Sequence, residues 1–291
     1  MISSNHTKNI LLSVYNYTAL FFGLNTKAEM RKILLQYTIV ICLCSSILAV
    51  SAQTPSASST PAYDIPGYMG IKAGLNVSNI VTLSSNPLAK GYTPISGFTG
   101  GYFLDLPIYN WLSFQPELNF QQQGAARNGL QAIANPSSLI TGNYAYANFN
   151  NTDKLSYLQI PLEAKFIWNV SRTFKFYANA GPFVEFMIGG KSTSTGTSDV
   201  YSDAAGHYPV VANQSYNITQ NIQHNLHAVN AGGIGALGLS LNTKTGRLYL
   251  EAGGNLGFVN IQRHTGAIGR NYDLVHNFQI GYAILLKGVH G

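Results

Sequence analysis

The segment WLSFQPELNFQQQ, residues Trp111–Gln123, alternates apolar and polar side chains along most of its length. Successive side chains of an extended strand point to opposite faces, so a period of two predicts a β-strand. In a soluble sheet the apolar row would meet a core, whereas in a membrane barrel it faces lipid and the polar row faces the lumen. The apolar row consists of Leu112, Phe114, Pro116, Leu118 and Phe120.

The composition of the chain favours membrane strands over a soluble domain. Only 10% of the 291 residues are charged, against about a quarter in soluble domains. The mean hydropathy of +0.06 is far too low for a bundle of membrane helices. Alternating strands explain both values, because their apolar and polar residues average out. A soluble barrel of the lipocalin type is the alternative, and it would need a polar outer face.

The amino-terminal region predicts export. The basic stretch 30–32 (MRK) precedes an apolar run from 33 to 50, and the tripeptide 50–52 (VSA) has the small residues that a signal peptidase reads. We therefore expect a signal peptide over residues 30–52, with a retained transmembrane helix as the alternative. Residues 1–29 would then be an upstream extension from a misassigned start. Residues 53–66 are expected to form a flexible linker of small residues.

Export also changes what the cysteines and the net charge imply. Cys42 and Cys44 both lie within the expected signal, so the mature chain would hold no disulfide or thiolate metal site. The first 52 residues contain four of the 17 Lys/Arg and one of the 11 Asp/Glu, which leaves 13 minus 10, or +3. The basic charge is therefore partly a property of the exported segment, which excludes nucleic acid as a partner.

The connections between the alternating segments are long and short in turn. Segments without alternation at 124–153 and 189–225 are expected to be long loops, whereas 107–110, 169–173 and 242–246 are expected to be short turns. Outer-membrane barrels have short periplasmic turns and long extracellular loops. The expected strands lie at 68–79, 95–106, 111–123, 154–168, 174–188, 226–241 and 247–261, with an eighth ending at 287.

These patterns together predict an all-β fold located in the bacterial outer membrane. We expect an eight-stranded antiparallel up-and-down transmembrane β-barrel over residues 67–287, preceded by the signal peptide and followed by a short tail at 288–291. Aromatic residues beside the expected short turns predict an interfacial girdle on the periplasmic side. The girdle consists of Tyr109, Trp111, Trp168 and Phe174.

Charged residues on the expected inward faces are interpreted as a structural network. The interior of an eight-stranded barrel is just filled by side chains, and buried charges need partners. A narrow ion-conducting channel is the alternative. The network consists of Lys72, Asp105, Glu117, Glu163, Lys165, Lys175, Glu185 and Glu251.

Two segments, SFQPELNFQQQGA (113–125) and KLSYLQIPLEAKF (154–166), resemble the PorT-like outer-membrane β-barrel family of Gram-negative bacteria. In that family a strand similar to QPEL, followed by glycine, precedes a later strand similar to YLxIPL. The segments at 70–80 (GIKAGLNVSNI) and 252–261 (AGGNLGFVNI) are similar to its first and penultimate strands. The resemblance implies an outer-membrane barrel. It also implies assistance to secretion or surface-polymer export as a candidate role.

Residues that suggest other chemistry lack the spacing that this chemistry requires. Gly233–Gly238 matches G-x-G-x-x-G, but a strand and a turn follow instead of a helix, so we attribute these glycines to close strand packing. A metal site and a lipid-modifying site at the outer rim are the alternatives for the loop residues, but no spacing links the candidates. These candidates are Ser202, Asp203, His207, His224, His227 and His264.

The expected function is therefore non-enzymatic. We expect a monomer with a structural or adhesive role, or an accessory to secretion, with no cofactor and no metal. Its expected partners are outer-membrane lipid, the barrel-assembly machinery and secretion-system or surface components. A rim-located lipid-modifying enzyme and an ion-conducting channel remain the alternatives.

Overall fold

The computed structural model describes residues 66–82, 84–136, 140–263 and 270–286. These residues belong to one compact unit, Ala62–Gly291. The expected upstream extension (1–29), the signal peptide (30–52), the tail (288–291) and all of the linker except residue 66 lie outside the described residues. Within the described ranges, no helix is long and apolar enough to cross a membrane.

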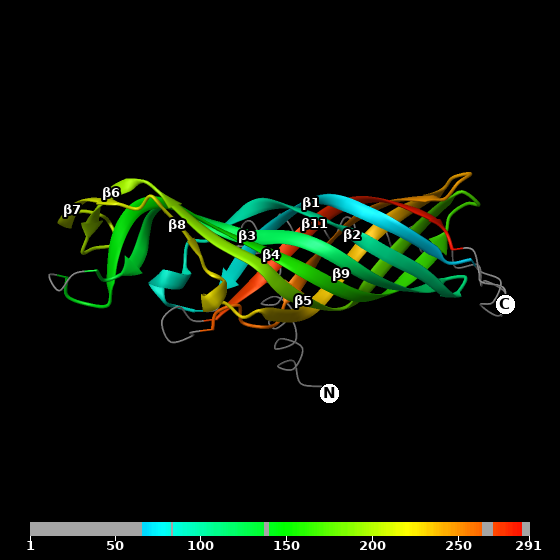
Figure 1. The fold of residues 1–291 in the computed structure, drawn as a ribbon, viewed down its shortest axis with the longest axis horizontal. Coiled ribbons are helices and arrows are strands. Elements are labelled where there is room, and N and C mark those ends of the chain that lie inside the picture. Colours follow the sequence, from blue (N-terminus) through cyan, green and yellow to red (C-terminus); the bar gives the residue numbers. More distant parts are fainter. Residues whose placement is uncertain (1–65, 83, 137–139, 264–269, 287–291) are drawn as a thin grey trace, which may run out of the picture. The chain divides into compact units, whose positions relative to one another are not determined.

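The described chain is almost entirely β-structure (Figure 1). Two short 3₁₀ helices, η2 (Pro87–Ala89) and η3 (Gln223–Asn225), lie between strands. The strands are β1 (Tyr68–Thr82), β2 (Thr93–Tyr109), β3 (Leu112–Ala134), β4 (Tyr144–Asn169), β5 (Phe174–Thr195), β6 (Thr197–Tyr201), β7 (Pro209–Ser215), β8 (Ile218–Asn221), β9 (Val229–Asn242), β10 (Arg247–Gly257) and β11 (Asn271–Leu285).

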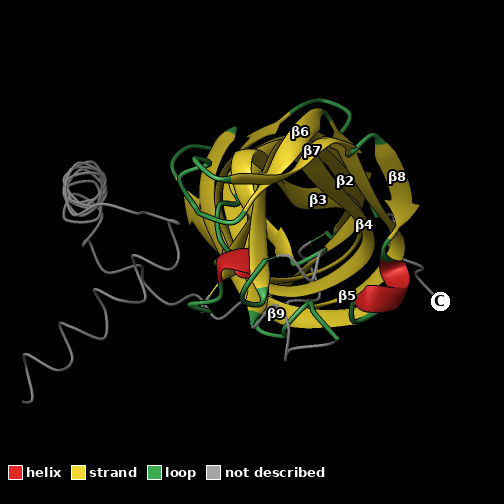
Figure 2. Cartoon of the chain, turned by 90° about the vertical axis from the view of Figure 1, so that its left-hand side faces the viewer, coloured by secondary structure: helices red, strands yellow, loops and turns green. Residues whose placement is uncertain are grey.

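The strands close into a ring. The 11-stranded sheet has the order β7-β6-β4-β3-β2-β1-β11-β10-β9-β5-β8, and an additional β4–β5 pairing closes it. Because β6, β7 and β8 lie outside the closed circuit, eight strands form the ring, which is seen along its axis in Figure 2. All neighbouring strands are antiparallel. The predicted eight-stranded antiparallel barrel is confirmed.

The two faces of each strand have opposite polarity. In β3, Gln115 and Glu117 are 2% and 4% exposed, whereas Phe114 and Leu118 are 38% and 44% exposed. The same contrast recurs in β1, where Lys72 is buried and Ile71 is exposed. A polar interior with an apolar exterior is the arrangement of a membrane barrel. It excludes the soluble alternative, which required a polar outer face.

The two ends of the barrel differ in their connections. One end, here called the short-turn end, carries the turns at 110–111, 170–173 and 243–246, together with the start of β1 and the end of β11. At the other end, here called the extension end, β3, β4 and β5 run on well past the neighbouring strands (Figure 1).

The prediction of loops at 124–153 and 189–225 was wrong for most of these residues. The β3–β4 ladder continues from Gly124↔Lys154 to Ala134↔Tyr144. The second segment contains the end of β5 and all of β6, β7 and β8. Strand pairing requires only backbone hydrogen bonds, whereas alternation requires that one face meets an apolar phase. Beyond the apolar outer band that requirement ends, so the pairing continues without alternation.

The extension has a small apolar core of its own. Buried Ile140, Ala145 and Val200 form a cluster, against which Val210 and Val211 of β7 pack. Strand β6 is joined to β4 through Tyr146↔Tyr201 and Ala147↔Val200. The extension is therefore a small packed sheet that is continuous with the barrel wall.

Candidate functional site

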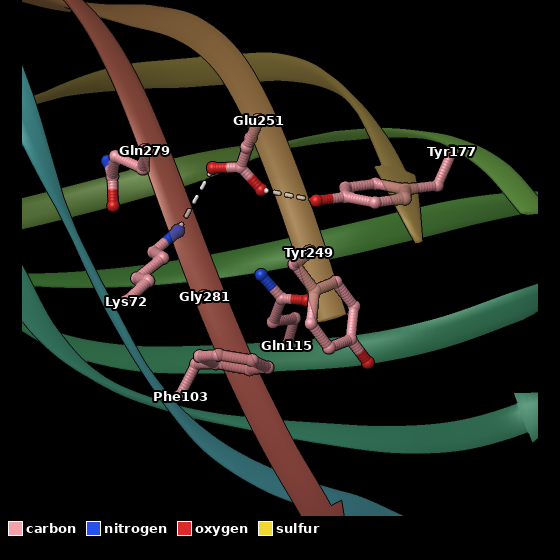
Figure 3. A pocket seen from close by; sticks show the side chains of 8 residues that line it. All are labelled: Lys72, Phe103, Gln115, Tyr177, Tyr249, Glu251, Gln279 and Gly281. Atoms are coloured by element: carbon pink, nitrogen blue, oxygen red, sulfur yellow. Dashed lines mark hydrogen bonds and ion pairs between the residues drawn. The ribbon is translucent and has the colours of Figure 1, made fainter. Parts of the chain in front are cut away.

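The lumen near the short-turn end contains a charged cluster centred on Lys72, part of which, including Glu251 and Tyr177, is drawn in Figure 3. The Lys72 Nζ lies 2.7 Å from Glu117 Oε1 and 3.0 Å from Glu251 Oε1. The second oxygen of Glu251 accepts a hydrogen bond from the Tyr177 hydroxyl at 3.1 Å. These contacts join β1, β3, β10 and β5 across the barrel interior.

A second cation, Lys165, is enclosed more tightly. Its Nζ lies 3.0 Å from Asp105 Oδ2 and donates to Gln115 Oε1 at 2.8 Å. The same nitrogen lies 4.3 Å from the ring centroids of both Tyr177 and Tyr249. The two aromatic faces stabilise a cation that is removed from water. Lys165 is therefore held by a carboxylate, an amide and two rings.

The charges of this half of the lumen balance. Arg247 lies 3.8 Å from Asp105, and Asn179 donates a hydrogen bond to Glu163. Half-buried Lys175 lies at the same end. Four basic residues therefore match four acids, which reduces the cost of burying them. They are Lys72, Lys165, Lys175 and Arg247, with Asp105, Glu117, Glu163 and Glu251.

Nearer the extension end, the lumen contains two carboxylates within a network of amides. Glu185 accepts hydrogen bonds from Asn230 at 2.8 Å and from Gln123 and Gln159 at 3.1 Å each. The same Gln123 amide donates to Asp273 at 3.4 Å. Among the described residues, no lysine or arginine forms an ion pair with either carboxylate.

Side chains fill this interior. The cavity beside Lys72 and Glu251 has a volume of about 10 Å³, which is room for about one water molecule. Towards the extension end, buried Leu155, Tyr157 and Leu226 pack together. A second apolar cluster contains Ile80, Ala125 and Ile261. In the described lumen, the polar network therefore lies towards the short-turn end and these apolar side chains lie towards the extension end.

The structure places seven of the eight predicted lumen residues on the buried inner face; the eighth, Lys175, is half-buried. The sequence reasoning missed Arg247 and Asp273, which also face inward. Both missed residues lie an even number of positions from inward residues of their strands, namely Glu251 and Asn277. Both residues lie within the expected strands, so strict alternation carried back to the start of each strand identifies them.

The four predicted girdle residues lie at the short-turn end. Tyr109 and Trp111 are 52% and 54% exposed, and their rings stack with centroids 5.8 Å apart. Trp168 is 40% exposed, and its ring centroid lies 5.4 Å from that of Phe176. Phe174 is half-buried at the start of β5.

At the rim, the Asp203 side chain forms hydrogen bonds with the backbone of the β6–β7 turn. Its carboxylate accepts hydrogen bonds from the backbone N–H groups of Ala205, His207 and Tyr208. Desolvation acts to raise the pKa of Asp203, but these N–H donors and the adjacent His207 hold the pKa below its ordinary value.

The other rim candidates are not joined into a reactive set. The Ser202 hydroxyl donates to the carbonyl of Tyr208 at 3.5 Å, and no hydrogen bond joins it to a histidine in the described chain. His224 and His227 are exposed, whereas His264 lies outside the described residues. The described ranges contain no group of three or more His, Cys, Asp or Glu that could hold a metal.

The glycines of 233–238 lie within strand β9 and begin no helix. A Cβ on Gly238 would lie 2.1 Å from the ring of Tyr177 on the neighbouring strand. Gly238 therefore makes room for the ring that covers Lys165 and bonds Glu251. Its role in this network is one of packing.

The comparison with protein-family models shows the kind of barrel. A family model described as an outer membrane protein beta-barrel domain matches residues 52–263. No curated protein sequence matches the chain.

Several solved outer-membrane proteins are similar in structure. Ail, the attachment invasion locus protein of Yersinia pestis, is 12% identical, with 76% of this chain and 100% of that chain covered and a TM-score of 0.34. OprG of Pseudomonas aeruginosa is 11% identical, with 79% of this chain and 100% of that chain covered and a TM-score of 0.33. The outer membrane protease OmpT of Escherichia coli is 9% identical, with 80% of this chain and 100% of that chain covered and a TM-score of 0.42.

Proposed function

The chain belongs to the outer membrane protein beta-barrel domain family, and from this premise we propose that it is a non-enzymatic surface protein whose extension binds a partner outside the cell. The protein is located in the bacterial outer membrane. Barrels of this membrane have short periplasmic turns and long extracellular connections. In our proposal the short-turn end therefore faces the periplasm and the extension end faces the medium.

The observation that carries this proposal is the packed sheet at the extension end. Its strands form ladders between β3, β4, β6 and β7 around the Val200 cluster. Phe149 and Tyr216 stack nearly parallel, with centroids 4.3 Å apart. Tyr208 remains 68% exposed and Ile218 54% exposed. A preorganised surface with exposed aromatic and aliphatic groups is suited to binding, because little ordering is needed when a partner docks.

Two features of the described residues favour binding over transport and catalysis. The interior is cross-linked by ion pairs and has room for about one water molecule beside Lys72, which argues against an ion pathway. At the rim, the Asp203 carboxylate is occupied by backbone N–H groups. It therefore has no free role as the orienting acid of a nucleophilic site.

Placement within the PorT-like branch is a further part of this proposal. It is supported by the motifs at 113–125 and 154–166, which form neighbouring strands β3 and β4. On this reading the partner of the extension is a secretion-system or surface component, and the barrel itself acts as a monomer.

Replacement of residues 197–217 by a short Gly/Ser turn tests the adhesive role. This change removes β6 and β7 and keeps every residue of the eight ring strands, including β5, which ends at Thr195. Cell–cell and cell–surface adherence should fall to the level of a gene deletion, while the barrel remains heat-modifiable on gels. A Lys244→Gln variant, altered in a turn at the opposite end, serves as the control.

Unchanged adherence of the folded 197–217 replacement would contradict the proposal. The same conclusion would follow if the deletion strain adhered as well as the wild type. If the replacement variant is not heat-modifiable, the comparison passes to point variants of exposed Tyr208 and Ile218, which leave the strands in place.

A further inference from the structure

Two lysines lie directly opposite each other on the outer face of the barrel wall. Lys154 of β4 and Lys191 of β5 are register partners, and both side chains are exposed. Opposed residues of an antiparallel pair have Cβ atoms about 5 Å apart, and like charges at this spacing are destabilising. Neither lysine forms an ion pair with a described acid. The arrangement therefore calls for an anion from outside the chain.

The position of Lys154 and Lys191 relative to the membrane follows from their distance to the apolar outer band of β4. On the outer face of β4, apolar residues run from Trp168 at the short-turn end to Leu158. Ten residue steps, at about 3.3 Å each and a tilt of about 40°, span about 25 Å, which is the height of the lipid-facing band of such barrels. Four further residues place Lys154 about 10 Å above the band.

The surroundings of the pair are polar. The row between Leu158 and Lys154 contains Ser156, paired with exposed Gln122. On the far side of Lys191 lies Asn221 of β8, its register partner. A groove of about 420 Å³ opens there, and it is lined by Lys191 and by the side chains of Thr219, Gln220, Asn221 and Gln223 among others. Hydroxyl and amide groups thus supply further donors beside the two ammonium groups.

We propose that Lys154 and Lys191 bind the phosphate groups of the glycolipid that forms the outer leaflet of the outer membrane. A phosphate bridging the two ammonium groups removes their mutual repulsion and forms charge-assisted hydrogen bonds with both. The acyl chains of the same molecule lie along the apolar band below, beside residues such as Leu158 and Phe186. Lipid is the source of the anion because the pair lies at headgroup height, directly above that band.

The test uses the purified, folded protein in a zwitterionic detergent and native mass spectrometry with bisphosphorylated lipid A as the probe. We expect the Lys154→Gln/Lys191→Gln variant to bind this lipid about 10- to 30-fold more weakly than the wild type. Each basic residue near an anionic membrane surface contributes about fivefold to the attraction. Dephosphorylated lipid A should bind both proteins equally.

A matched control variant and a measurement of thermal stability separate effects on lipid binding from effects on folding. Lys90 is also exposed and lies in the connection between β1 and β2 at the same end, so Lys90→Gln should bind lipid A like the wild type. Without lipid, the double variant should melt no lower than the wild type, because a repulsive pair has been removed. With lipid A, only the wild type and Lys90→Gln should gain thermal stability.

Equal affinity of the double variant and the wild type for bisphosphorylated lipid A would overturn the proposal. It would also fall if Lys90→Gln lost as much affinity as the double variant, because attraction would then come from general surface charge. A wild-type protein that bound dephosphorylated lipid A just as tightly would show that the acyl chains, and not the phosphates, are recognised.

Discussion

At the scale of single residues, Phe114 reports on which face meets lipid. It is exposed on β3 and pairs with Ala164, which lies between Trp168 and Leu158 in the apolar row of β4. Phe114→Arg should therefore lower the free energy of unfolding by about 2–4 kcal/mol, the cost of a basic residue near the membrane midplane. Denaturant titration of the protein in lipid vesicles measures this difference.

Gln122 provides the matched control on the same strand. It is exposed on the outer face of β3 and pairs with Ser156, above the apolar row. Gln122→Arg should cost about 0–1 kcal/mol, because the penalty falls towards the interface. If Phe114→Arg assembled and unfolded like the wild type, the assignment of the outer face would be wrong.

Lys165 tests the lumen network. Lys165→Met removes the cation nearest to the buried Asp105 carboxylate, and the remaining Arg247 lies farther away, at 3.8 Å. Removal of one partner of a buried ion pair costs about 3–5 kcal/mol. Adding Asp105→Asn should recover a large part of this loss, whereas Lys175→Met, at a half-buried position, should cost little.

The double-mutant cycle of Lys165 and Asp105 decides the interpretation. A coupling free energy near zero would mean that the two residues are held by other contacts and that the ion pair has no structural role. If the ion pair helps to hold the barrel together, the coupling free energy between Lys165 and Asp105 should be at least about 1 kcal/mol. This is the scale expected for residues in direct contact.

Individual inward residues were predictable, but their partners were not. Alternation in the sequence placed Lys72 and Glu117 on the inner face, where the structure has them buried. The Glu251 contact with Lys72 joins residues 179 positions apart. It depends on closure of the ring through β11 and on the register of each pair, neither of which a single strand encodes.

At the scale of elements, the ring strands were predictable and their extensions were not. The short turns and apolar rows gave each ring strand, because lipid on one side and packed polar groups on the other impose a period of two. In the β3–β4 extension, exposed residues such as Asn128 and Asn148 give no such signal. Pairing there follows from the ladder that begins in the barrel wall.

The β6–β7 turn should depend on the ionised Asp203 carboxylate. Because hydrogen bonds lower its pKa in the folded turn, the stabilisation is fully present above the unfolded pKa of about 3.9 and is lost as the pH falls through the lower folded value. Protease cleavage near residues 203–208 should therefore stay slow at pH 5 and accelerate only in strong acid.

The substitution Asp203→Ala should make this cleavage fast at every pH, because its three backbone donors lose their acceptor. An acid-stable protease measures both effects, and the melting temperature of the barrel should not change. Equal cleavage rates for the variant and the wild type at pH 5 would show that the turn is held by other contacts.

At the scale of the whole molecule, the packed lumen predicts a closed barrel. The ion pairs of Lys72 and Lys165 span the interior, and the cavity beside Lys72 measures about 10 Å³. In planar bilayers the purified protein should show no discrete conductance step under conditions in which a porin conducts. Reproducible single-channel steps of one size would contradict this and would favour the channel alternative.

The orientation of the whole barrel is the claim on which the proposed function and the lipid site both depend. Single cysteines at Tyr208, at the extension end, and at Lys244, in a short turn, can be labelled on cells with a maleimide that does not cross the outer membrane. We expect the cysteine at 208 to react on intact cells and the one at 244 to react only after the outer membrane is permeabilised. Labelling at 244 but not at 208 on intact cells would contradict it.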